Sequence, residues 1–344
     1  MALAGLSRED VARCARRSPS EAASGDSIMR PLLRYTPYFI VFGFAAWCLV
    51  SFRGDLAQLS LAPLAHSWDL VALAAALSLT NYALRIVRWR MYLARLGYPL
   101  PFGFCALTFT AGFAYTLSPG KFGEMVRARY YLPLGIPLAD VAAAFFTERL
   151  LDLTVMAVLS ALLLAAYAHY QGLIGGAMAI VLAVLVMLAA LPWPRITTAL
   201  RSGQARPLRM LTGISSALAS TRALLSPGML ASGFGLGLAA WGLEGVGLGV
   251  LSMMFGPLHA GPAVYVGIYG IASLAGGLSF LPGGLGSTEA VMTTLLATNG
   301  YAVPEALTAT LACRIVTLWL AVGLGWVAVL TLRQRQPAMV TPWR

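Results

Sequence analysis

The sequence has few charged residues for its length. Of 344 residues, 11% are charged and 59% are hydrophobic, and the mean hydropathy is +0.76. A soluble domain carries roughly 25% charged residues. The deficit excludes an ordinary soluble enzyme or nucleic-acid-binding domain, and it predicts an all-α polytopic membrane protein.

Cysteine and histidine are also scarce, and neither is clustered. The four cysteines and the three histidines are dispersed along the chain. They form neither a metal-ligand spacing nor a disulfide framework. We therefore expect no metal site, no cofactor and no catalytic residue, and the protein is not expected to be an enzyme.

Long apolar runs are plentiful. A membrane-spanning helix needs roughly 20 apolar residues. Six such helices are expected, at about 35–52, 68–92, 140–167, 173–191, 229–254 and 305–331. Two further stretches, 102–118 and 263–299, are short or interrupted by glycine and proline.

The basic residues assign a side of the membrane to each loop. Of the 24, 21 lie in five segments, which are the tail up to Arg34, Arg85–Arg95, Lys121–Arg129, the loop 195–222 and the C-terminus from Arg333. The positive-inside rule makes these segments cytoplasmic, so the net charge of +11 reflects topology in a cell (inner) membrane rather than nucleic-acid binding. Stretches 102–120 and 263–299 must then each enter and leave the membrane on the same side, which makes them re-entrant hairpins. Irregular backbone at that depth requires surrounding protein or water.

The two hairpins carry related sequences. "SPGKFGE" at 118–124 matches "LPGGLGSTE" at 281–289. Glycine, acid and arginine follow both motifs at the same mutual offsets, as Gly135, Asp140 and Arg149 and as Gly300, Glu305 and Arg314. Because the charges place the two copies on opposite sides, the pattern predicts an inverted repeat, which is typical of transporters.

This pattern defines the expected organisation. A disordered N-terminal cytoplasmic tail and a C-terminal cytoplasmic tail are expected to flank a single transmembrane domain, whose two repeats are joined by a basic cytoplasmic loop. The ranges are 1–34 for the first tail, 35–331 for the domain, about 68–167 and 229–331 for the repeats, 192–228 for the loop and 332–344 for the second tail.

Four segments resemble a known family. They are "RIVRWRMYLARLG" at 85–97, "LSPGKFGEMVRARYY" at 117–131, "ERLLD" at 148–152 and "LPGGLGSTEA" at 281–290. The chain resembles the lysylphosphatidylglycerol synthase transmembrane (flippase-like) family, the membrane half of the multiple peptide resistance factor, without its synthase domain. The resemblance implies a role in moving a lipid between leaflets. Lipid aminoacylation is not expected, because this sequence ends soon after the last apolar run.

The candidate binding residues are those that bring polarity to the membrane interior. Each Pro-Gly break leaves a half-helix N-terminus that favours an anion, with Lys121, the single lysine, adding charge and Ser287 and Thr288 as caps. The substrate-binding candidates are Lys121, Glu124, Glu148, Arg149, Asp152, Pro282, Gly283, Gly284, Ser287, Glu289 and Arg314, and the secondary ones are Arg85, Arg88, Arg127 and Glu244.

Two interpretations stay open for the charged candidates. Arg149 and Arg314 bind either a headgroup phosphate or structural carboxylates, because a charge in mid-span is costly unless paired or hydrated. Glu148 and Asp152 are expected on one helix face with Arg149 pointing elsewhere. Arg85, Arg88, Arg90, Arg127 and Arg129 are expected to anchor helix ends by snorkelling to the cytoplasmic surface, or to recruit anionic headgroups there.

The predicted function is a transporter that moves an anionic or modified lipid between leaflets. The headgroup, of a phospholipid or lipid-linked precursor, binds at the re-entrant half-helix N-termini. The alternatives are a transporter or channel for a soluble anion, which a closed aqueous cavity would favour, and an intramembrane lipid-headgroup enzyme. The expected partner is a membrane lipid, and no nucleic acid is expected to bind. A monomer and a homo-oligomer both stay open.

Overall fold

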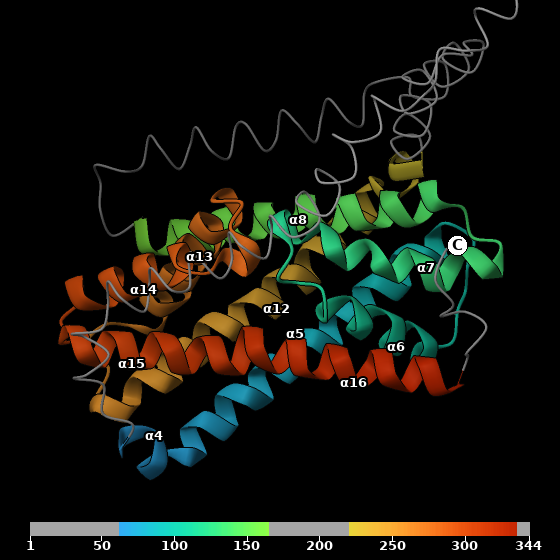
Figure 1. Cartoon of the computed structure of the whole chain (residues 1–344). Helices are drawn as coiled ribbons and strands as arrows, with labels where there is room; N and C mark the ends of the chain where they lie inside the picture. Colours follow the sequence, from blue (N-terminus) through green and yellow to red (C-terminus); the bar gives the residue numbers. More distant parts are fainter. Residues whose placement is uncertain (1–61, 165–219, 336–344) are drawn as a thin grey trace, which may run out of the picture. The chain divides into compact units, whose positions relative to one another are not determined.

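The computed structural model describes residues 62–164 and 220–335 (Figure 1), and these residues contain helices but no strand. The all-α prediction is confirmed for them. The expected spans 35–52 and 173–191, the tail 1–34 and most of the loop 192–228 and of the tail 332–344 lie outside the described residues.

The helices begin and end close to the boundaries expected from the apolar runs. Ordered along the chain they are α4 (Ala62–His66), α5 (Trp68–Arg95), α6 (Phe102–Phe113), η1 (Pro119–Arg127), α7 (Ala128–Tyr131), η2 (Leu132–Leu134), α8 (Leu138–Leu164), α12 (Pro227–Ser252), η4 (Met253–Phe255), α13 (Pro262–Leu278), η5 (Pro282–Gly284), α14 (Ser287–Thr298), α15 (Val303–Arg314), the π-helical segment η6 (Ile315–Trp319) and α16 (Leu320–Arg335).

Three helical stretches of the described residues are long and apolar enough to cross a membrane. They are Trp68–Arg95, Pro227–Phe255 and Val303–Gln334, and they match three of the expected spans. The expected span 140–167 corresponds to α8, a helix of 27 residues that is not among these three. Its middle carries Glu148, Arg149 and Asp152, so its place in the bundle depends on partners for those charges.

The packing pairs relate the first half of the described chain to the second. Helix α5 packs on α12, α8 packs on α13, and α6 packs on α16. Figure 1 shows α5 and α12 running in opposite directions, and α4, which precedes α5, contacts η4 at the end of α12. Each of these three pairs joins an element of residues 62–164 to one of residues 220–335.

Glycine allows several of these helices to approach closely. A Cβ on Gly267 would lie 2.5 Å from the Cβ of Leu163, where α13 meets α8. A Cβ on Gly325 would meet the backbone of Phe113 and Ala114, where α16 meets α6. Small residues at such contacts are typical of helix packing in membranes.

The core consists of separate clusters of buried apolar side chains. One involves α8 and α12 to α15 and includes Leu248, Ile268 and Met292. A second is centred on α5, α6 and α8 and includes Trp89 and Phe109. The charged residues described below lie where elements of the second cluster meet.

The repeated sequence offsets correspond to repeated local structure. Gly135 and Gly300 both have positive φ, 79° and 104°, a conformation that favours glycine. Asp140 and Glu305 then lie in the first turns of α8 and α15, where a carboxylate is favoured by the helix dipole.

Candidate functional site

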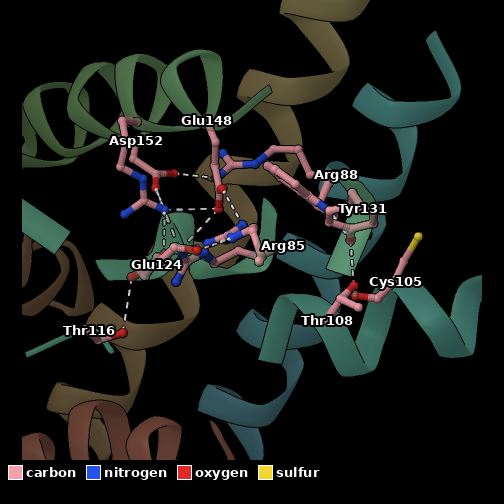
Figure 2. Close-up of polar contacts among 12 residues, drawn as sticks. Arg85, Arg88, Cys105, Thr108, Thr116, Glu124, Tyr131, Glu148 and Asp152 are labelled. Atoms are coloured by element: carbon pink, nitrogen blue, oxygen red, sulfur yellow. Dashed lines mark hydrogen bonds and ion pairs between the residues drawn. The ribbon is translucent and has the colours of Figure 1, made fainter. Parts of the chain in front are cut away.

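The centre of the described bundle holds a network of ion pairs, referred to below as the arginine cluster. It joins α5, η1 and α8, and Figure 2 shows Glu148 and Asp152 extending from α8 toward arginines of α5. Its members are Arg85, Arg88, Arg127, Arg149, Glu124, Glu148 and Asp152. Four arginines face three carboxylates, which gives a formal excess of one positive charge.

Glu148 is the central carboxylate of the arginine cluster. Its Oε1 lies 3.0 Å from Arg149 Nη2 and 3.2 Å from Arg85 Nη2. Its Oε2 lies 3.2 Å from Arg127 Nη1, and Arg88 is 3.6 Å away. A carboxylate held by four guanidinium groups is strongly compensated, which is what a buried charge requires.

Asp152, one helical turn further along α8, is also multiply bound. Its Oδ1 accepts a bond from Arg88 Nη2 at 2.5 Å and one from Trp241 Nε1 at 2.9 Å. Its Oδ2 lies 3.1 Å from Arg149 Nη2. The shared face expected for Glu148 and Asp152 is confirmed, because both contact the same arginines.

The snorkelling expected for Arg85, Arg88 and Arg127 is wrong. Their side chains are only 5%, 0% and 0% exposed, and they point into the bundle. The spacing of three residues places Arg85 and Arg88 on one face of α5, opposite α8. Arg127 lies over the aromatic faces of Phe109 and Trp89, with its guanidinium carbon 4.4 and 4.5 Å from the ring centroids, an arrangement that favours a cation.

The expectation that Arg149 points away from Glu148 and Asp152 is also wrong. The long side chain turns back, so that Arg149 Nη2 lies near both carboxylates and 3.7 Å from Glu124. Arg149 is nevertheless 17% exposed, the largest value for an arginine of the cluster. Its Nε has no hydrogen-bond partner among the described residues, whereas Nη2 makes the ion pairs with Glu148 and Asp152.

Arg314 holds together the second Pro-Gly break. Its Nε donates to Glu289 Oε1 at 2.6 Å and its Nη2 donates to the carbonyl of Gly283 at 2.7 Å. Glu289 Oε2 in turn accepts a bond from the backbone N–H of Gly286 at 2.6 Å. Arg314, the motif and the start of α14 therefore form one connected unit.

The caps expected for this half-helix are not those observed. Helix α14 begins at Ser287, its N-cap is Gly286, and neither Ser287 nor Thr288 makes a capping bond. The Ser287 hydroxyl donates to Gly284 O and to Ser279 Oγ. Gly283 and Gly284 have φ of 61° and 66°, and a left-handed turn there displaces the helix start beyond Pro282.

The first break has related contacts but a different backbone. Residues 119–127 form a 3₁₀ helix rather than an α-helical half. Glu124 accepts bonds from Thr116 at 3.2 Å and from Arg127 at 2.7 Å. Its ion pair with Arg149 corresponds to the pair of Glu289 with Arg314. The expected role of Lys121 lies outside the described side chains.

A large cavity adjoins these charged groups and is referred to below as the amphipathic pocket. It has a volume of about 310 Å³ and lies between α8 and the end of α13. Arg149, Asp152 and Arg314 supply its charges, and Gly283 and Gly284 line it as well. The rest of its lining is largely apolar and includes Phe146, Leu153, Leu278 and Phe280, all of which are exposed on the described surface.

A second and smaller cavity of about 50 Å³ is lined mostly by buried side chains, and we refer to it as the inner cavity. Its polar lining includes Arg85, Glu124, Glu244 and Arg314. Trp241, Tyr269 and Arg314 line both cavities. On this measure a water needs about 10–15 Å³, so the inner cavity has room for several water molecules.

Trp241 and Tyr269 were not predicted as site residues. Trp241 lies in the middle of α12, away from the interfaces where tryptophan is common. It is three residues from Glu244 on the same helix, and this mid-span position beside a charge was a usable signal. Tyr269, in the glycine-rich α13, had no comparable sequence signal.

The chain is similar to known membrane proteins. A family model described as lysylphosphatidylglycerol synthase TM region matches residues 38–325. A UPF0104 membrane protein from Methanothermobacter thermautotrophicus is 30% identical over 281 residues, which are 75% of this chain and 82% of the relative. The family match includes both Pro-Gly motifs and every residue of the arginine cluster.

Proposed function

The chain belongs to the lysylphosphatidylglycerol synthase transmembrane-region family, and from this premise we propose that it moves an anionic or modified lipid between the leaflets of the membrane. The substrate is a phospholipid or lipid-linked precursor with a phosphate in its headgroup. The membership, predicted from the four motifs, is confirmed, and the lipid substrate is our proposal.

The amphipathic pocket is the observation that carries this proposal. It brings Arg149 and Arg314 together with an apolar wall in one space of about 310 Å³. Leu278 and Phe280 are 70% and 66% exposed and continue the wall to the surface of the described bundle. A headgroup phosphate would bind the arginines while its acyl chains stay along Phe146, Leu278 and Phe280.

The charges of the pocket suit a ligand that replaces existing ion pairs. An arginine in mid-span costs about 2.5–3.5 kcal/mol or more unless it has a partner. Arg149 and Arg314 have carboxylate partners within the protein. A phosphate would take over part of this role, and the excess positive charge of the arginine cluster matches one anionic headgroup.

The fold suits alternating access. In our proposal the interrupted helices on either side of the two Pro-Gly motifs are re-entrant hairpins, and repeats 68–167 and 229–331 are inverted in an inner membrane with both termini cytoplasmic. The exchanged packing pairs α8–α13 and α6–α16, and the contact between η1 and η5, support it. Movement of one repeat against the other would open the site to each leaflet in turn.

The alternatives have less support. A soluble anion needs no apolar wall, whereas the larger cavity is lined mainly by apolar side chains. For an enzyme, a nucleophile with a base, or a metal, would be needed. Among residues 62–164 and 220–335 no group of three or more His, Cys, Asp or Glu is placed to hold a metal ion.

A lipid-translocation assay tests the proposal. The full chain is reconstituted in phosphatidylcholine vesicles, and the movement of acyl-labelled fluorescent phosphatidylglycerol is followed by quenching of the outer leaflet. We expect Arg149→Gln to slow translocation at least tenfold and Arg149→Lys to slow it less, because the positive charge is retained. Arg95→Gln, at the exposed end of α5, is the matched control.

Phe280→Asn separates lipid from soluble anion. Phe280 has a φ of 53°, a left-handed conformation that asparagine adopts more readily than phenylalanine. The variant should fold as well as the wild type, yet it removes part of the apolar wall. Slower lipid translocation with unchanged thermal unfolding supports the lipid site, and wild-type rates for both Phe280→Asn and Arg149→Gln would refute it.

A further inference from the structure

The inner cavity contains a carboxylate that the proposed lipid site does not use. Glu244 lies in the middle of α12, 2% exposed. Its Oε2 accepts a hydrogen bond from Ser78 Oγ at 2.8 Å, and its Oε1 accepts one from Asn81 Nδ2 at 2.9 Å. Both donors lie on α5, and both are neutral.

These two partners can serve either protonation state of Glu244. The Asn81 side chain is fully buried, and its Oδ1 has no hydrogen-bond partner among the described residues. A protonated Glu244 could donate its O–H to this oxygen once the amide rotates, while Ser78 can donate or accept. Asn81 Oδ1 therefore gains a hydrogen-bond donor when Glu244 carries a proton.

The inner cavity connects Glu244 to the lipid site. It has room for water, and Arg314 lines both this cavity and the amphipathic pocket. Charges close to Glu244 bias its protonation. An anionic headgroup that neutralises Arg314 would remove positive potential from the inner cavity and favour uptake of a proton by Glu244.

We propose that Glu244 binds and releases one proton in each transport cycle, so that an anionic lipid and a proton move together. This inference rests on the proposed lipid transport. A proton from water on one side is added to the Glu244 carboxylate as the anionic headgroup binds. It returns to water on the other side as the lipid leaves, and the loaded transporter carries no added net charge across the membrane.

The groups around Glu244 are consistent with this role. Helix α5 contributes Tyr82 and Arg85, η1 contributes Glu124, α13 contributes Tyr269, and α15 contributes Arg314 and the nearby Cys313. The charges of α8 (Glu148, Arg149 and Asp152) do not line the inner cavity. The charged groups that share the cavity with Glu244 are Arg85, Glu124 and Arg314.

The test measures a distribution rather than a rate. The full chain is placed in phosphatidylcholine vesicles containing a trace of fluorescent phosphatidylglycerol, with the membrane potential clamped and a pH difference of one unit imposed. One proton per lipid predicts about tenfold more probe in the leaflet on the alkaline side at steady state, because one pH unit is a tenfold difference in proton activity. Protein orientation does not affect this ratio.

Two variants and a second measurement complete the test. Glu244→Gln should keep the leaflet ratio at one, at whatever rate it exchanges lipid. Glu305→Gln, which changes a carboxylate that binds the backbone N–H of Ala302 at the start of α15, should retain the wild-type ratio. Infrared spectra should show a protonated carboxylic acid band in wild-type protein that grows when phosphatidylglycerol is added and is missing in Glu244→Gln.

Each outcome decides between specific claims. Wild-type translocation with a leaflet ratio of one, or accumulation on the acidic side, overturns co-transport but leaves lipid transport standing. An absence of wild-type translocation refutes the proposed function for this lipid. The infrared band then still decides whether Glu244 takes up a proton with the anionic lipid, and a band that is missing or indifferent to lipid overturns that role.

Discussion

At the scale of single residues, the five arginines that form buried or partly buried ion pairs in the described residues fall into two groups. Arg85, Arg88 and Arg127 are essentially buried, whereas Arg149 and Arg314 are 17% and 12% exposed and line the amphipathic pocket. The first group fixes the carboxylates of α8 and η1. The second group is the one that a ligand can reach.

We expect Arg127→Leu to destabilise the folded protein strongly. It would leave Glu124 and Glu148 short of a partner, and breaking a buried pair in this way costs about 3–5 kcal/mol. Arg95→Leu, at the exposed end of α5, should change the free energy of unfolding by less than about 0.5 kcal/mol. Both values are measured by denaturant titration in mixed micelles.

A second substitution checks the cause. Glu124→Gln in the Arg127→Leu background should recover part of the loss, because Glu124 loses its closest cation and keeps only Arg149, at 3.7 Å. The coupling is read from a double-mutant cycle. If Arg127→Leu and Arg95→Leu had the same free energy of unfolding, the Arg127 side chain would be solvated rather than buried.

At the scale of secondary structure, α15 and α16 form one long helical stretch with a π-helical irregularity between them. The π-helical segment η6 starts directly after Arg314, and the carbonyls of Val316 and Thr317 accept bonds from the Tyr82 hydroxyl of α5. π-Helical turns are frequent at functional sites. Here the segment places Thr317 and Leu318 against the inner cavity.

The close contact between α16 and α6 gives a prediction for glycine. Gly325→Ala should destabilise the protein by about 1–3 kcal/mol, because its Cβ meets backbone that cannot move aside easily. Gly323→Ala, two residues earlier on the same helix, meets nothing within 4 Å and should be neutral or stabilising by up to about 1 kcal/mol. Thermal unfolding in detergent compares the pair, and equal shifts would mean that α6 and α16 are not packed at Gly325.

At the scale of the whole molecule, the charge pattern and the packing lead to the same proposal. The positive-inside rule places the loop after α5 in the cytoplasm and the loop after α12 outside. The opposite directions of α5 and α12 (Figure 1) agree with an inverted arrangement of the two halves. Binding at the centre of such a repeat is typical of secondary transporters.

Labelling of single cysteines tests this orientation. Pro99→Cys and Pro257→Cys lie in exposed positions of the two loops and are compared in a background without Cys14 and Cys48, since Cys105 and Cys313 are buried. We expect a membrane-impermeant maleimide to label Pro99→Cys in inside-out vesicles and Pro257→Cys in intact spheroplasts. Labelling of both from one side would contradict the inverted repeat.

The sequence by itself determined the class of the protein, the approximate boundaries of three long apolar helices and the family. Apolar runs follow directly from the cost of burying polar groups in lipid, and proline and glycine interrupt helices through local backbone geometry. The boundaries of α5, α12 and α15–α16, and the positive φ of Gly135 and Gly300, could therefore be predicted from neighbouring residues.

Only the tertiary structure decided which charges face one another. Arg85 and Glu148 are 63 residues apart in sequence, and charge counting treats Arg85 as a cytoplasmic anchor because it cannot show which neighbour its helix face meets. The same holds for Trp241 and Tyr269, which line both cavities only because α12 and α13 pack together. Ion pairs and cavities depend on contacts between distant segments, and these are fixed when the helices pack.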